Sequence, residues 1–195
     1  MHILHYFKNY KKQSFPAFCM LLFVMFVVTD SYTTYLVDPD LKYDENPIVR
    51  FFQWGWIETW VYIFCLVLLS LFFAVKSNKY IFNYFENKKR DIPVNKFLFI
   101  ICCLLLIYCY HNLIATFECS INNYLMYIQI QSDSESWIWG IATHYVEFIW
   151  KFNAKFGNNA NVYFMPVLET IIATIITVCQ IRRVRKYIYS AAEDL

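Results

Sequence analysis

Four runs of apolar residues, each long enough to cross a lipid bilayer, constrain this chain more than any other feature of its sequence. A transmembrane helix needs about 20 mostly apolar residues to cross about 30 Å of hydrocarbon. The runs cover about residues 14–37, 53–75, 96–118 and 161–181. An open sheet would leave unpaired backbone groups in lipid, and the alternation of a lipid-facing barrel strand is missing from all four runs. Each run therefore predicts a helix.

The composition supports the same fold class. The chain is 59% apolar and only 16% charged, whereas soluble domains carry about 25% charged residues. It contains 3 glycines and 5 prolines, too few for the turns of a compact soluble enzyme, and its 21% aromatic content excludes disorder. We predict an all-α, polytopic four-helix membrane bundle, with residues 1–195 forming a single integral membrane domain.

Positively charged residues predict the orientation, because short loops rich in lysine and arginine stay on the cytoplasmic side. Thirteen of the 17 basic residues fall on one side of the predicted bundle. They are Lys8, Lys11, Lys12, Lys76, Lys79, Lys88, Lys89, Arg90, Lys96, Arg182, Arg183, Arg185 and Lys186. Both termini are therefore expected in the cytoplasm, with the protein in the cell membrane. This bias accounts for the basic loops, so the lipid bilayer is an expected partner and nucleic acid is not.

A fifth apolar segment, about residues 137–152, is short and contains His144, Glu147 and Lys151. If it crossed the membrane, the basic cluster from Arg182 to Lys186 would be exported. Tryptophan and tyrosine also prefer the headgroup level of a bilayer. We therefore predict an interfacial amphipathic helix on the outer side of the bundle.

Ionisable residues inside the predicted helices form the candidate site. Asp30 lies seven residues before the end of the first helix, His111 seven before the end of the third, and Glu169 eight after the start of the fourth. At 1.5 Å per residue, all three lie about 10 to 12 Å below the outer surface. Ionisable groups cost about 2.5 to 3.5 kcal/mol each at the bilayer centre, which favours their convergence inside the bundle.

Three chemistries fit such a cluster. Imidazole and carboxylates suit a divalent metal ion, so Asp30, His111, Glu169 and Glu45 are candidate ligands. Asp30, His111 and Glu169 are equally candidates for general acid–base catalysis, and a polar layer that fixes helix packing needs no chemistry at all. His144 and Glu147 could close a metal site from above. Alternatively, Glu147 pairs with the lysine four residues later as an ordinary surface couple.

The first predicted helix ends in the string V-V-T-D-S-Y-T-T-Y. About ten residues later comes the string Y-D-E-N-P-I-V-R, and together the two strings carry a family resemblance over Asp30 to Arg50. It resembles a family of small uncharacterised bacterial and archaeal integral membrane proteins with an Asp-x-x-Thr-Thr helix end and a later Glu-Asn-Pro. The chain lacks the glycine usual before the acidic residue. The resemblance implies that one unit is formed by Asp30, Thr33, Thr34, Glu45, Asn46 and Pro47.

Three function classes follow from these observations. The first is a structural or partner-binding membrane subunit, with another membrane protein as its partner. The second is a membrane-embedded, metal-dependent hydrolase or lipid-modifying enzyme with its site at the outer leaflet. The third is a small transporter or channel subunit, although inverted repeats and broken helices typical of transporters are not evident in the sequence.

Overall fold

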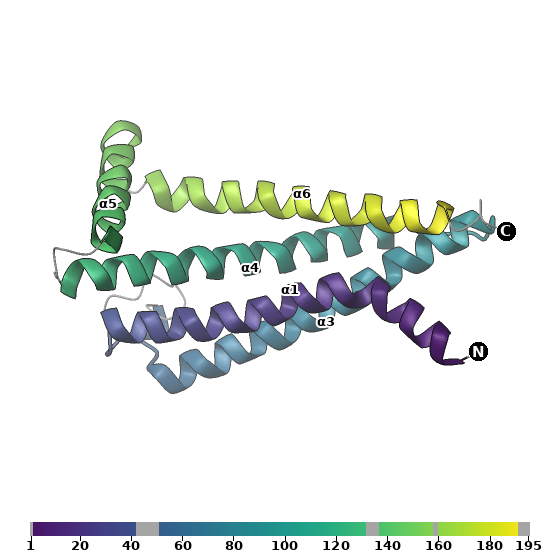
Figure 1. Cartoon of the computed structure of the whole chain (residues 1–195), viewed down its shortest axis with the longest axis horizontal. Helices are drawn as coiled ribbons and strands as arrows, with labels where there is room; N and C mark the ends of the chain where they lie inside the picture. The colour runs from purple at the N-terminus through teal and green to yellow at the C-terminus, as the bar shows by residue number, and fades with distance from the viewer. Residues whose placement is uncertain (1, 42–50, 132–136, 158–159, 191–195) are drawn as a thin grey trace. The chain divides into compact units, whose positions relative to one another are not determined.

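The computed structural model describes residues 2–41, 51–131, 137–157 and 160–190, and in these ranges the chain forms helices and no strand (Figure 1). The long helices are α1 His2–Val37, α3 Trp56–Lys89, α4 Lys96–Gln131, α5 Trp137–Phe156 and α6 Ala160–Ser190. The prediction of an all-α chain is confirmed over the described residues.

Four of these helices contain a stretch long and apolar enough to cross a membrane. The stretches are Phe18–Val37, Trp56–Lys89, Lys96–Ile128 and Tyr163–Ser190. They belong to α1, α3, α4 and α6 and coincide in order with the four predicted spans. α5 has 20 residues and contributes no such stretch among the described residues. The chain thus has the helices of a four-span membrane bundle and one further amphipathic helix.

The helices are longer than the sequence predicted. α3 continues past Val75 to Lys89, α4 past Glu118 to Gln131, and α6 past Ile181 to Ser190. α3 alone has 34 residues, which is about 51 Å of helix against about 30 Å of hydrocarbon. Hydropathy reports only where a helix can lie in lipid, whereas the backbone hydrogen-bond ladder continues until capping residues end it.

A Schellman motif ends α3. Asp91 adopts a left-handed conformation with φ of 54°, and the Ile92 amide donates to the Asn87 carbonyl at 3.0 Å. Pro93 follows and cannot continue the ladder. Asn95 then caps the start of α4, because its side-chain Oδ1 accepts a hydrogen bond from the Leu98 amide at 3.0 Å. The turn between α3 and α4 is therefore set by local chemistry.

The described residues fall into two compact units. Unit 1 consists of Met1–Leu22, Val67–Leu113 and Thr170–Leu195. In this unit the Cys109 thiol donates to the Ser70 carbonyl at 3.3 Å, and the rings of Tyr84 and Phe99 stack with centroids 4.2 Å apart. The earlier α3 residue Ser70 meets the later α4 residue Cys109, and the later α3 residue Tyr84 meets the earlier α4 residue Phe99, so α3 and α4 are antiparallel.

Unit 2 consists of Phe23–Leu66 and Ile114–Glu169. Here α1 and α4 run parallel, because the Ser120 hydroxyl donates to the Phe26 carbonyl at 3.1 Å and the later pair Asn123 and Asp30 lies 3.1 Å apart. α5 also belongs to unit 2 and crosses the end of α4 and the start of α6 (Figure 1). That the whole chain is one membrane domain stays a prediction.

Candidate functional site

Asp30 is held by a residue that sequence reasoning missed. The Asn123 side-chain amide donates to Asp30 Oδ1 at 3.1 Å and to Thr34 Oγ1 at 2.9 Å. Asp30 and Thr34 thus share a partner on α4, whereas the buried Thr33 hydroxyl donates to the Asp30 and Thr29 carbonyls of its own helix. Asn123 lies beyond the predicted end of its helix at Glu118, so the sequence placed it in an outer loop.

The resemblance grouped Asp30, Thr33 and Thr34 with Glu45, Asn46 and Pro47. The last three lie outside the described residues. That they form a unit with the end of α1 stays a prediction.

His111 belongs to unit 1 and is half-buried on α4. Its Nδ1 lies 3.4 Å from the Thr170 hydroxyl of α6. The next residue, Asn112, donates from its side-chain amide to the Ser70 hydroxyl at 3.5 Å. Because α4 continues to Gln131, the distance of His111 from a helix end no longer gives its depth in the membrane.

Glu169 is buried on α6 and belongs to unit 2 with Asp30, whereas His111 belongs to unit 1. Over the described residues, no three His, Cys, Asp or Glu side chains form a group that could hold a metal ion. Glu45, the fourth candidate ligand, lies outside those residues. The convergence of Asp30, His111 and Glu169 stays a prediction, and so does their role in binding a metal ion or in acid–base catalysis.

A second polar cluster, also missed from the sequence, lies in unit 1. The Tyr110 hydroxyl of α4 donates to Gln180 Oε1 of α6, and Gln180 Nε2 donates to Asn78 Oδ1 of α3 at 2.6 Å. All three residues are buried, with exposed fractions of 0% for Tyr110, 3% for Asn78 and 7% for Gln180. These residues, called the amide core here, connect three of the four spanning helices.

A periodic signal in the sequence could have revealed the amide core. On α3 the buried positions recur every three or four residues, as expected for one helix face. From Val67 onward they are Val67, Ser70, Ala74, Ser77, Asn78, Ile81, Tyr84 and Phe85. The nearby lysines led to the interpretation of residues 76 to 95 as a loop, which hid this face.

On α5, Glu147 and Lys151 form the surface couple that was the alternative to a metal site built on His144 and Glu147. Glu147 lies 3.1 Å from the Lys151 ammonium and 3.8 Å from His144 Nδ1, and all three side chains are exposed. The hydrogen bond and charge of Lys151 lower the pKa of Glu147 below its usual range. These contacts are those of a solvated helix face.

Tyr145, one residue after His144, joins α5 to α4. It forms a side-chain hydrogen bond with Glu118, and burial together with the Glu118 carboxylate raises the pKa of Tyr145 to about 12. The phenol therefore remains protonated at neutral pH and can act as the donor. This contact joins α5 to α4 within unit 2.

No family model, curated protein or solved structure matches this chain. The sequence resemblance over Asp30 to Arg50 thus stays a prediction, and the fold class that the chain itself displays is that of an all-helical, four-span membrane protein with an additional amphipathic helix.

Proposed function

We propose that this chain is a structural or partner-binding subunit of the cell membrane. The observation that supports this function best is the amide core. Its hydrogen bonds run from helix to helix and use both ends of the Gln180 amide. In an apolar surrounding, such a contact specifies one helix register, because a shift along either helix separates donor from acceptor.

The other polar contacts favour the same role. Asn123 joins α4 to α1, Ser120 donates to an α1 carbonyl, and Cys109 donates to an α3 carbonyl. Polar side chains described here thus hold helices together. The metal-dependent hydrolase or lipid-modifying enzyme and the transporter or channel subunit stay hypotheses from the sequence, since these contacts favour neither.

The proposed orientation places both termini in the cytoplasm. The basic residues support it. Arg90 lies in the turn between α3 and α4, and Arg182, Arg183, Arg185 and Lys186 lie in the last turns of α6. The positive-inside rule retains such residues on the cytoplasmic side. α5 then lies on the outer side, where another membrane protein or the lipid surface could contact it.

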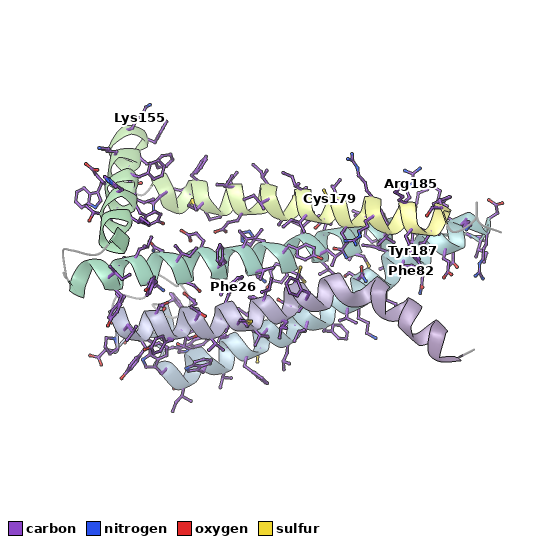
Figure 2. The ribbon with its side chains drawn as sticks, in the orientation of Figure 1. Phe26, Phe82, Lys155, Cys179, Arg185 and Tyr187 are labelled. Carbon is purple, nitrogen blue, oxygen red and sulfur yellow. The ribbon has the colours of Figure 1, made fainter. Side chains whose placement is uncertain are left out.

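A double-mutant cycle at the amide core tests the structural role. We expect Tyr110→Phe and Gln180→Leu each to lower the free energy of unfolding in mild detergent, with a coupling energy of about 1 kcal/mol. Cys179→Ala serves as the control, because Cys179 is the exposed neighbour of Gln180 on α6 (Figure 2).

The sign of the effect separates the function classes. A polar group retained for activity is often kept at a cost in stability, so its replacement by an apolar residue raises stability. A more stable Gln180→Leu protein would therefore contradict the proposed structural role.

A further inference from the structure

Four phenylalanine rings form a continuous row over α5 and the start of α6. Phe148, Phe152 and Phe156 follow each other at intervals of four residues on α5, with ring centroids 6.2 and 4.9 Å apart. Phe152 also contacts Phe164 of α6, with centroids 5.4 Å apart. These residues, called the phenylalanine row, all belong to unit 2.

Three of the four rings in the phenylalanine row are exposed. Exposed fractions are 61% for Phe148, 62% for Phe156 and 50% for Phe164. Contiguous exposed apolar surface marks a site of contact with another molecule or with a membrane. The row also continues into the apolar stretch Tyr163–Ser190, which is long enough to span a membrane. Because Phe164 lies within this stretch and is exposed, the row on α5 is contiguous with exposed apolar surface at the start of α6.

A charged stripe runs beside the row on the same helix. His144, Glu147, Lys151 and Lys155 recur at intervals of three or four residues, so they share a face of α5 adjacent to the phenylalanines. The Lys155 ammonium lies 5.3 Å from the centre of the Phe156 ring. Figure 2 shows Lys155 at the C-terminal end of α5, with its side chain directed away from α6. A helix with an apolar row and lysines at its edge is suited to a membrane–water interface.

We propose that α5 is a lipid-binding element whose phenylalanine row contacts the acyl chains of membrane phospholipids, with Lys151 and Lys155 at the level of their phosphate groups. The Tyr145 contact with Glu118 holds α5 where this face meets the bilayer. Phospholipid is favoured over a second copy of the chain because the row is continuous with a membrane-spanning surface and has cationic groups along its edge. This inference goes beyond the proposed function and does not depend on it.

Photocrosslinking in the full chain tests the proposal. The photoreactive residue p-benzoylphenylalanine replaces Phe148 or Phe156 in protein reconstituted into vesicles of phosphatidylcholine and phosphatidylglycerol. We expect both positions to form adducts with lipid, detected by mass spectrometry of the intact protein. His144 is the matched control on the charged stripe and should form fewer lipid adducts than either row position. Phe72, exposed on the apolar part of α3, is the positive control.

Each other outcome contradicts the proposal. Adducts between two protein copies at positions 148 and 156 would assign the row to self-association. Absence of lipid adducts at both positions, while position 72 reacts, would show that the row does not meet the bilayer. Circular dichroism on each variant establishes that its helices are intact. Because two positions of the row are tested, the result does not depend on the folding of a single variant.

Discussion

Two adjacent asparagines on α4, Asn122 and Asn123, differ in whether they donate a hydrogen bond to α1. Asn123 donates to both Asp30 and Thr34, whereas Asn122 makes no such contact in the described residues. We expect Asn123→Ala to lower the free energy of unfolding by about 1 kcal/mol, because a carboxylate among packed helices loses a donor. Stepwise denaturation in mixed micelles, followed by circular dichroism, measures this change.

Asn122→Ala is the matched control, since it removes the same side chain one position away. It should leave the free energy of unfolding nearly unchanged. Equal losses in the two variants would show that the hydrogen bonds of Asn123 do not hold α1 against α4.

At the scale of an element, the attachment of α5 depends on a protonated phenol. The pKa of Tyr145 is raised to about 12 from a model-compound value of 10.0. Between these values the unfolded chain binds fewer protons than the folded chain, so stability falls as the pH rises through the window from pH 10 to about 12. We expect this loss in the wild-type protein and a smaller loss in Tyr145→Phe, measured by thermal unfolding at stepped pH.

Tyr163→Phe controls for the general effect of alkaline pH, because Tyr163 is exposed at the start of α6. It should show the same pH dependence as the wild type. If the curves of the wild type and Tyr145→Phe are parallel over this window, the contact with Glu118 does not hold α5 in place.

At the scale of the whole molecule, four spans and an excess of basic residues on one side predict the topology. Single-cysteine variants, made after replacement of the seven native cysteines, report it through a membrane-impermeant maleimide. We expect Lys151→Cys to react in intact cells and Lys88→Cys to react only after the membrane is permeabilised. Reaction of residue 88 in intact cells would overturn the proposed orientation.

Local features of the sequence account for the number, order and type of the long helices. Hydropathy is a sum over neighbouring residues, so a run of about 20 apolar residues favours a membrane-spanning helix whichever helix packs against it. The amphipathic pattern of α5 is likewise a property of its own residues. The surface pair of Glu147 with Lys151 could be predicted from the sequence, as one of two interpretations, because both residues lie on one helix. Segment types are thus local properties of the chain.

Which polar residues meet across helices follows from the packed fold and not from the local sequence. Because α4 continues to Gln131, Asn123 lies in a helix and not in the expected loop, and it can reach α1. The partners of Asp30 and Gln180 lie 93 and 102 residues away in sequence. Such pairs depend on the register between packed helices, to which every contact along their length contributes, and no local pattern of residues specifies it.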